Sequence, residues 1–297
     1  MKKVNPNTAY KRNGKTIWVE QKNVGRGHQY LVHDHEGMLD SNQKPIKMPS
    51  VTGVVGATDG SATEPIKRWA LKHAIEYAKS GVGSGVKGDT DLQSMLDNAK
   101  KWPDSVLKMA GDRGTRIHNA IETFLHPNST ASQWKSKLDS NIDDIDKLET
   151  CFLKIEAWIN ESELKVVATE PLVYHKELQV GGAVDLMLSD EKSKIYICDF
   201  KTGSQVYKKD ALQVTGYISC LISMLEDNVE LWDRYNLTMP HGDDLENLQV
   251  GGAIFHIKEE EAEVDLKHIH VTNGAIFASA AFLHAYQKQN VFHEIAL

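Results

Sequence analysis

Several features are scarce or missing in this sequence, and each absence excludes a class of protein. Only three cysteines, Cys151, Cys198 and Cys220, occur among 297 residues. They are too few and too far apart for a disulfide framework, a CxxC zinc site or a four-cysteine iron–sulfur cluster, and we interpret Cys198 and Cys220 as small buried hydrophobes. No run of about 18 apolar residues occurs, and the first residues lack the apolar stretch of a secretory signal. We therefore expect a cytoplasmic protein without a membrane-spanning helix.

An excess of basic residues is also missing. The formal net charge is −7, which argues against a protein that coats nucleic acid through an overall basic surface. Nucleic acid is not excluded, because screening limits exposed charges to a Debye length of about 8 Å at physiological salt. A local basic rim, or bound divalent cations, can outweigh a distant acidic surface.

The hydrophobic content of 41% is enough for a large core, and the pattern along the chain predicts an α/β protein. Alternating segments at 16–20 and 29–33 predict an N-terminal hairpin, and apolar residues at helical spacing predict a helix over 63–79. Residues 92–160 are helical in pattern, and three successive strands are expected at 166–174, 179–188 and 194–201. A helix over 209–226, strands over 248–257 and 262–269 and a helix over 273–287 follow. We expect a single domain over 1–297, with a hairpin and helical region in 1–100 and the core in 101–297.

The glycine-rich stretch from Ser80 to Gly88 contains Gly83-x-Gly85-x-x-Gly88, a formal match to the dinucleotide-binding fingerprint. That fingerprint requires a strand directly before it, whereas here a helix precedes it. We therefore interpret the stretch as a mobile connection rather than a nucleotide site.

The most informative segment runs from Glu170 to Gly203. If the polar turn at 190–194 is centred on Lys192, antiparallel pairing places residues whose numbers sum to 384 opposite each other, and Asp185 and Asp199 meet this condition. Lys201 projects from the same face as Asp199 because side chains alternate with period two. The preceding hairpin, which turns near 176–177, brings Glu170 close to Asp185.

Clustered acids repel one another and raise each other's pKa unless positive charge lies among them. A hard divalent cation, Mg²⁺ or Mn²⁺, is the simplest partner for them. An isolated Asp-x-Lys on a strand is usually a solvated face, but Asp185 opposite it and the glycines Gly181 and Gly182 beside it favour a functional cluster.

These residues resemble the RecB-like branch of the PD-(D/E)XK nucleases. The motifs of that family correspond here to Gly114 to His118 on a helix, Gly182 to Asp185, the run Asp199-Phe200-Lys201-Thr202-Gly203, and Gln213 with Tyr217. The segment Pro49-Ser50-Val51-Thr52 and the residues from Arg113 to Leu125 are similar to stand-alone phage and mitochondrial genome-maintenance exonucleases. The resemblance covers roughly residues 48–217 and implies a central mixed β-sheet flanked by helices.

The resemblance also implies roles for individual residues. Asp185, Asp199, His118 and the backbone carbonyl of Phe200 would hold one or two Mg²⁺ or Mn²⁺ ions, and no iron–sulfur cluster is expected. Lys201 would orient or help deprotonate the attacking water, Glu170 is open between an outer ligand and a surface residue, and Glu122 would support His118. The candidates for contacting DNA or supporting the site are Gln213, Tyr217, Thr202, Arg113, Thr115, Ser50 and Thr52.

The function implied is a metal-dependent DNA exonuclease that prefers single-stranded ends and acts in replication, repair or recombination. The resemblance also implies DNA as the partner, with a helicase, a recombinase or a single-strand-binding protein as candidate companions. A phage-encoded enzyme would act in the host cytoplasm. Two alternatives stay open: a structure-specific endonuclease, and a catalytically silent nuclease fold that only binds DNA.

Overall fold

The chain forms two compact units, and it has the mixed α/β architecture predicted from the sequence. The computed structural model describes residues 9–12, 15–25, 27–58, 63–83, 89–126, 129–138, 145–191, 194–228, 230–235, 237, 248–269 and 274–287. The first unit comprises residues 1–58 and 118–297, and the second comprises residues 59–117. The single domain expected from the sequence stays a prediction. No helix within the described ranges is long and apolar enough to cross a membrane.

A four-stranded antiparallel sheet forms the N-terminal part of the first unit. Its strands, in spatial order, are β1 (Tyr10–Arg12), β2 (Lys15–Val24), β3 (Gly27–His33) and β4 (Met48–Pro49). The short helix η1 (Glu36–Met38) lies between β3 and β4. The predicted hairpin is confirmed, since β2 and β3 pair from Trp18 opposite His33 to Val24 opposite Gly27.

A five-stranded mixed sheet forms the centre of the first unit, in the order β11-β10-β9-β8-β5. These strands are β5 (Lys165–Thr169), β8 (Leu186–Ser189), β9 (Lys194–Lys201), β10 (Gln249–Lys258) and β11 (Glu263–Ile269). The pairing of β10 with β9 is parallel, and the other three pairings are antiparallel.

The three strands predicted between residues 166 and 201 are five in the structure. A separate two-stranded sheet contains β6 (Leu172–His175) and β7 (Val180–Ala183), so the first two predicted strands each divide into two. The first division falls at Glu170, whose φ of 48° is left-handed, and at Pro171, which has no N–H for a ladder. The chain therefore passes from the central sheet to the smaller sheet and back.

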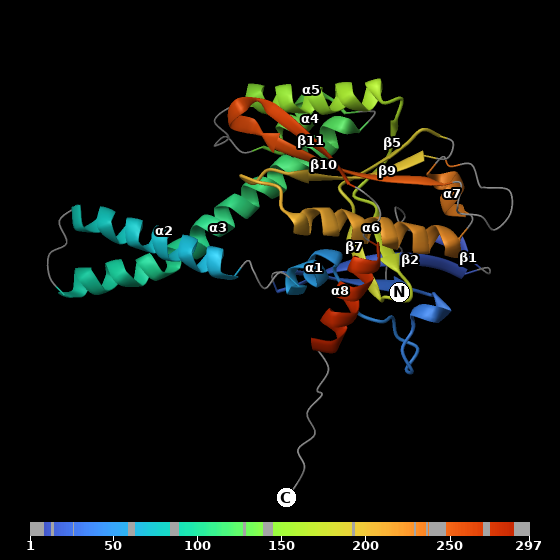
Figure 1. Ribbon diagram of the computed structural model, residues 1–297, viewed down its shortest axis with the longest axis horizontal. Coiled ribbons are helices and arrows are strands. Elements are labelled where there is room, and N and C mark those ends of the chain that lie inside the picture. Colours follow the sequence, from blue (N-terminus) through green and yellow to red (C-terminus); the bar gives the residue numbers. More distant parts are fainter. Residues whose placement is uncertain are drawn as a thin grey trace, which may run out of the picture. The chain divides into compact units, whose positions relative to one another are not determined.

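Helices cover both faces of the central sheet. Helix α5 (Ile145–Glu161) contacts β10 and β11, and α6 (Lys208–Asp227) contacts β9 and β10 from the other face (Figure 1). Alternation along β9 explains this arrangement, because Ile195 and Ile197 join the core with α6 while Tyr196 meets Trp158 of α5 at 6.4 Å between ring centres. The remaining helices of this unit are α1 (Val51–Thr58), α4 (Ala131–Lys135), α7 (Glu230–Arg234) and α8 (Gly274–Gln287).

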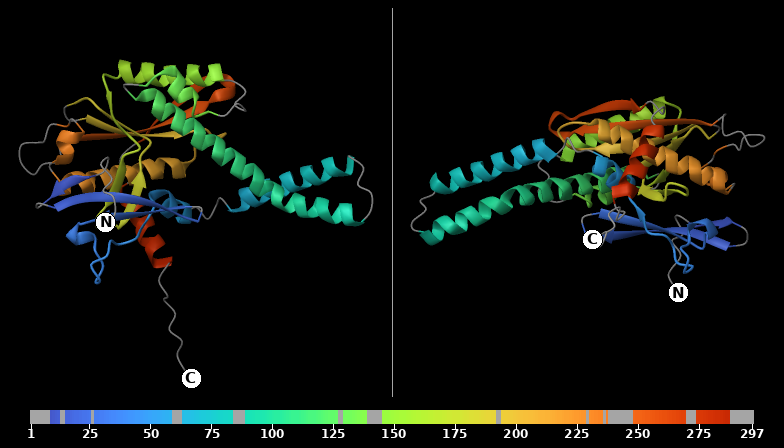
Figure 2. Two further views of the ribbon diagram at one scale, coloured as in Figure 1. Left: turned by 180° about the vertical axis from the view of Figure 1, so that it is seen from behind. Right: turned by 60° about the horizontal axis from the view of Figure 1, so that its bottom comes forward.

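The second unit is a pair of helices that lie side by side (Figures 1 and 2). It contains α2 (Thr63–Gly83) and the greater part of α3 (Asp89–Leu125), and the end of α3 from His118 onward belongs to the first unit. Tyr77 and Trp102 pack with their ring centres 5.0 Å apart. The sequence placed the end of the first helix at Lys79, but α2 continues to Gly83; Gly85 and Gly88 lie outside the described residues.

Candidate active site

Two aspartates meet where β8 begins and β9 ends. The register of β8 and β9 is the predicted one, with Leu186 opposite Cys198 and Met187 opposite Ile197. Asp185 directly precedes β8, and its Oδ2 accepts a hydrogen bond of 2.8 Å from the backbone N–H of Phe200. Asp199 is only 1% exposed. The two carboxylates are therefore held next to each other by the strand pairing itself.

Lys201 supplies a positive charge to this pair. Its Nζ lies 2.7 Å from Oδ2 of Asp199, and its side chain is 23% exposed. The two residues share a face of β9, as the alternation predicted. Lys201 is therefore about three-quarters buried and ion-paired, unlike a solvated surface lysine.

Helix α6 holds the other oxygen of Asp199. The amide nitrogen of Gln213 donates to Oδ1 of Asp199 at 3.0 Å and to the hydroxyl of Tyr217 at 2.9 Å. The hydroxyl of Tyr217 also lies 3.5 Å from Oγ1 of Thr52. The sequence left Gln213 and Tyr217 as candidates for contacting DNA or supporting the site. Oε1 of Gln213 also accepts from Nζ of Lys201 at 3.5 Å, so Gln213 contacts both Lys201 and Asp199, and Tyr217 supports Gln213. Contact with DNA stays a prediction.

The two glycines near the cluster make room for aromatic side chains. A Cβ on Gly181 would lie 2.7 Å from Cβ of Tyr30, and one on Gly182 would overlap the ring of Tyr217. In the sequence, Gly181 and Gly182 favoured a functional cluster, because glycine allows close approach of a backbone or a ligand. The structure fills the space with Tyr30 and Tyr217, which explains why no larger residue fits.

His118 reaches the cluster from the C-terminal part of α3. Its Nδ1 lies 3.4 Å from Oδ2 of Asp185, and its side chain is 25% exposed. Its ring also meets the buried ring of Phe200 edge-on, at 5.9 Å between centres. The helical histidine and the two strand carboxylates that the sequence predicted therefore lie together.

The charges in the cluster shift the pKa values in different directions. Burial and the charge of Asp185 raise the pKa of Asp199, and Lys201 only partly opposes them. For Asp185, burial is outweighed by His118 and by the N–H of Phe200, so its pKa falls below the usual value. Burial lowers the pKa of Lys201, but Asp199 and Asp185 raise it further, so the ammonium stays charged at neutral pH.

Opposing effects also set the pKa of His118. Burial lowers its pKa, whereas the nearby Asp185 and Asp199 raise it, and the net direction is upward. The metal-free cluster thus tends toward charge balance, with cations at Lys201 and His118 facing two carboxylates.

Two glutamates flank the cluster. The N–H of Glu170 donates to the carbonyl of Asp185 at 3.2 Å, which confirms that the hairpin brings Glu170 close to Asp185. Glu122 lies one turn after His118 on α3, close enough to Glu170 for their charges to interact. Burial and the charges of Glu170 and Asp185 raise the pKa of Glu122 to about 9, so it is protonated at neutral pH. The predicted support of His118 by Glu122 stays a prediction.

The donor set suits a hard divalent ion. Oδ2 of Asp199 is fully buried and has no aligned hydrogen-bond donor among the described residues, although Lys201 is paired with it electrostatically. An imidazole and two carboxylates are ligands that Mn²⁺ and Mg²⁺ accept. Within the described ranges, no three His, Cys, Asp or Glu side chains already converge as an ion site. The backbone carbonyl of Phe200 stays the predicted additional ligand.

The other predicted residues occupy various positions. Ser50 is buried, and its Oγ accepts the N–H of Gly53 at 2.9 Å, so it caps the start of α1. Thr202 directly follows β9 and is half-buried. Arg113 and Thr115 are exposed on the part of α3 that belongs to the second unit, where Thr115 Oγ1 donates to the carbonyl of Gly111. Contact of these residues with DNA stays a prediction.

Sequence reasoning missed His256. This residue is 5% exposed on β10, directly opposite Lys201 in the parallel ladder. Its Nε2 lies 2.7 Å from the carbonyl of Gly203, to which it donates, and its Nδ1 lies 3.9 Å from Asp265 on β11. His256 thus anchors the loop that follows Lys201. The only signal in the sequence is one histidine in an apolar strand, and its importance depends on a parallel pairing that the sequence does not specify.

The three cysteines are buried and free, as interpreted for Cys198 and Cys220. The chain matches no family model and no curated protein. The residues of the cluster and the resemblance of their motifs are therefore the basis for assigning a function.

Proposed function

We propose that this protein is a divalent-metal-dependent nuclease with a PD-(D/E)XK core, which hydrolyses phosphodiester bonds of DNA from single-stranded ends in the cytoplasm. One observation carries the proposal. Asp185, Asp199 and Lys201 lie together at the ends of two paired strands, and His118 approaches Asp185 from a helix. The resemblance assigns the side chains of these four residues to metal binding and catalysis.

The arrangement of the sheet supports the same proposal. The resemblance implies a mixed sheet flanked by helices, and here β9, which carries Asp199 and Lys201, is the central strand of such a sheet. Helix α6 carries Gln213 and Tyr217 against the cluster, at the place in chain order that the resemblance implies. Fold alone does not identify an activity, so the side chains carry the weight.

The residues of the cluster have distinct roles in hydrolysis. In the reaction, a water oxygen attacks phosphorus, the bond from phosphorus to the leaving oxygen breaks, and the leaving oxygen takes up a proton. A divalent ion, when bound by Asp185, Asp199 and His118, supplies hydroxide near neutral pH and neutralises phosphoryl oxygens. Lys201 is a cation with a raised pKa, so it stabilises growing negative charge rather than removing a proton. Gln213 keeps Asp199 in place.

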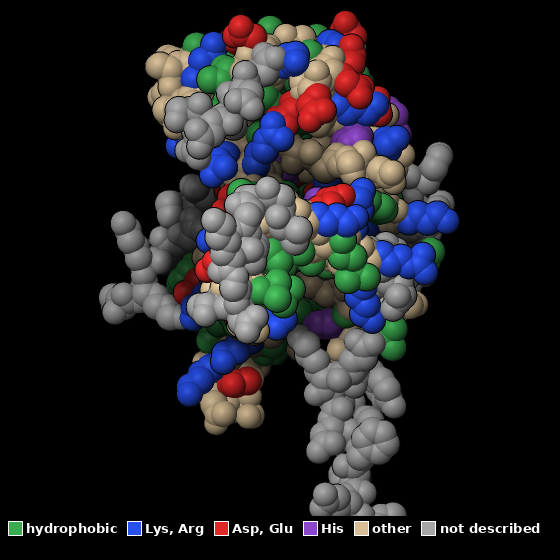
Figure 3. Space-filling model, turned by 90° about the vertical axis from the view of Figure 1, so that its left-hand side faces the viewer, with side chains coloured by type: hydrophobic (Ala, Val, Ile, Leu, Met, Phe, Trp, Pro, Cys, Tyr) green, Lys and Arg blue, Asp and Glu red, His purple; other side chains and the backbone are tan. Residues whose placement is uncertain are grey.

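The surface is consistent with local rather than overall attraction to DNA. Figure 3 shows Lys and Arg side chains interspersed with acidic and polar ones on the face that it presents. With a net charge of −7, contacts near the cluster must supply the affinity. A helicase, a recombinase or a single-strand-binding protein that exposes ends would be a suitable partner.

End-labelled single-stranded and double-stranded DNA, incubated with Mg²⁺, Mn²⁺ or EDTA, tests the proposal. We expect cleavage with either ion and none in EDTA. Asp185→Asn should abolish cleavage, whereas Asp233→Asn, a matched change at an exposed position on α7, should have no effect. Cleavage in EDTA, or full activity of Asp185→Asn with saturating metal, would contradict the proposal.

Covalently closed circular single-stranded DNA separates the exonuclease from its alternatives. An exonuclease leaves the circle intact, whereas a structure-specific endonuclease opens it. If linear and circular DNA both bind but neither is cleaved with any divalent ion, the protein is a silent binding module. The intact set of Asp185, Asp199 and Lys201 supports an active enzyme.

A further inference from the structure

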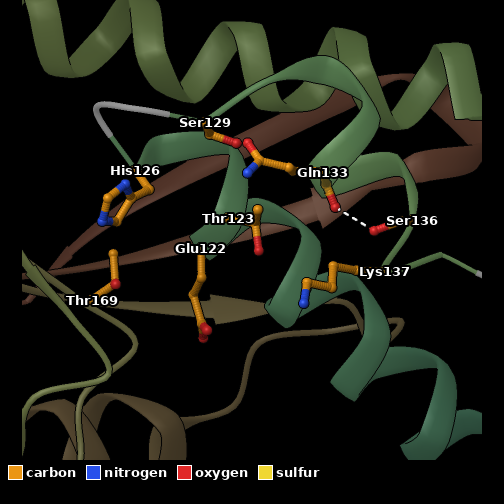
Figure 4. Close-up of a pocket in the computed structure, with 8 residues that line it drawn as sticks. All are labelled: Glu122, Thr123, His126, Ser129, Gln133, Ser136, Lys137 and Thr169. Carbon is orange, nitrogen blue, oxygen red and sulfur yellow. Dashed lines mark hydrogen bonds between the residues drawn. The ribbon is translucent and has the colours of Figure 1, made fainter.

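A polar cavity of about 500 Å³ lies beside the catalytic cluster, between the end of α3, α4 and the end of β5. Its volume falls in the range of about 300–1,000 Å³ in which small-molecule sites are found. Its lining consists of hydroxyl, amide, imidazole, ammonium and carboxyl side chains, without Phe, Tyr or Trp among the described lining residues. Figure 4 shows Glu122 and Thr123 from α3 and Gln133 and Lys137 from the α4 region around one space.

The cavity adjoins the residues that flank the two aspartates. Glu122 lines it and lies close to Glu170, whose N–H donates to the carbonyl of Asp185. Thr169 lines it as well and directly precedes Glu170. A ligand in the cavity would therefore lie next to a DNA strand at the catalytic cluster.

The cavity offers hydrogen-bond donors and one ammonium group. Lys137 is exposed and has no ion pair among the described residues, whereas the nearby Lys135 pairs with Glu149 at 2.8 Å. Oε1 of Gln133 accepts the N–H of Thr130 at 2.7 Å, which leaves the amide NH₂ of Gln133 as a donor toward the cavity.

This chemistry suits a sugar phosphate better than a nucleobase. An ammonium, an amide and hydroxyl groups are the donors that bind phosphate oxygens, and bases without sequence preference are usually held by stacking on aromatic rings. The cavity has ammonium, amide and hydroxyl groups, and its described lining lacks aromatic rings of Phe, Tyr or Trp. Recognition there would be independent of sequence.

We propose that this cavity is a nucleotide subsite that binds the phosphate and sugar of one nucleotide next to the cleaved bond, through Lys137, Gln133 and Thr169. The proposal deepens the proposed nuclease function and rests on it for the identity of the ligand. A nucleotide released by cleavage would have the same chemistry, so free deoxynucleoside monophosphate should bind there too.

Calorimetric titration in EDTA tests the subsite without turnover. The probes are deoxyadenosine monophosphate, deoxyadenosine and inorganic phosphate. We expect the monophosphate to bind at least about tenfold more tightly than deoxyadenosine, because a hydrogen bond to a charged group is worth about tenfold or more. Lys137→Ala should weaken the monophosphate by a similar factor, and Thr169→Val should weaken it less. Lys135→Ala is the matched control and should bind as wild type does.

A competition experiment distinguishes a strand subsite from a site for free nucleotides. Single-stranded DNA, added in EDTA, should displace the monophosphate if both use the cavity. Monophosphate binding that persists in Lys137→Ala, or that DNA does not displace, would overturn the inference. If binding depends on Lys137 but no ion supports cleavage, the nuclease proposal fails and the subsite stands. Cleavage by wild type together with unchanged monophosphate binding in Lys137→Ala would remove the subsite alone.

Discussion

Replacement of Lys201 by alanine should perturb both the stability of the protein and its proposed nuclease activity. The ammonium lies 2.7 Å from the carboxylate of Asp199, which is 1% exposed. At an effective dielectric constant of about 20, that separation corresponds to about 6 kcal/mol of gross attraction. Removal of one member of a buried pair typically costs about 3–5 kcal/mol, because the other charge stays buried without compensation.

Proton uptake limits this cost. With Lys201 in place the pKa of Asp199 is already raised to about 7, so at pH 7 about half of the wild-type molecules carry a proton on Asp199, and the variant can complete this uptake at little further cost. We therefore expect Lys201→Ala to lose only about 1 kcal/mol of unfolding free energy at pH 7, mainly the net value of the lost hydrogen bond. The pKa of Asp199 is raised in the folded protein, so the folded state binds more protons than the unfolded chain above the unfolded pKa of 3.8. Stability of the variant should consequently be greatest at low pH and fall, by at most about 1.4 kcal/mol per pH unit, as the pH rises toward the folded pKa.

Urea denaturation in EDTA at pH 5 and pH 7 measures this effect, with Lys194→Ala at the other end of β9 as control. The same preparations, under single-turnover conditions with Mn²⁺, should show a rate loss of about 100-fold or more for Lys201→Ala. Mn²⁺ binding should persist, since Lys201 is not a ligand in the proposed site. If Lys201→Ala cleaves at the wild-type rate and keeps the wild-type denaturation midpoint at both pH values, the lysine is only a surface residue and the reasoning fails.

Three further predictions concern the same cluster. Asp199→Asn should abolish cleavage but change the unfolding free energy by less than about 1 kcal/mol, because loss of the ion pair is offset by relief of repulsion with Asp185; urea titration checks it. His256→Phe should lower kcat with KM unchanged and leave the melting temperature near that of wild type, whereas His256→Gln, which keeps a donor for the carbonyl of Gly203, should restore kcat. Mn²⁺ affinity should fall as the pH falls through the raised pKa of His118, since a ligand must lose its proton to bind metal, and calorimetry should find a flatter pH dependence in His118→Asn.

Local patterns in the sequence were sufficient to place the strand pairing of the cluster. A turn at 190–194 and apolar alternation determine the register of β8 and β9, and the pairing of Leu186 with Cys198 follows that register. Pro171 was a signal for the division of the strand, because a proline cannot donate to a ladder. One continuous strand was nevertheless predicted over 166–174, because residues that favour strands, such as Val and Tyr, lie on both sides of Pro171.

Contacts between distant elements were not readable from the sequence. The parallel pairing of β10 with β9 brings His256 opposite Lys201, although the two residues are separated by 54 intervening positions in the sequence. Similarly, the sequence indicates that another group can approach the backbone closely at Gly182. That this group is Tyr217 depends on how α6 packs. Periodicity reports which face of an element is buried and carries no information about which neighbour buries it.

The charge pattern explains how this fold tolerates a site that burial alone would disfavour. Two carboxylates side by side, one of them 1% exposed, would each lose hydration and repel the other. Each carboxylate therefore has its own pair of partners. Asp185 accepts the N–H of Phe200 and lies beside the imidazole of His118. Asp199 pairs with Lys201 and accepts a hydrogen bond from Gln213. Because these partners come from β9, α3 and α6, three separate elements must pack correctly before the acids are compensated.

A divalent ion would add two further positive charges to a cluster that is already near balance, so it should displace the proton of His118 rather than the ammonium of Lys201, whose pKa is far higher. The lysine would then stay in place for catalysis while the histidine becomes available as a ligand.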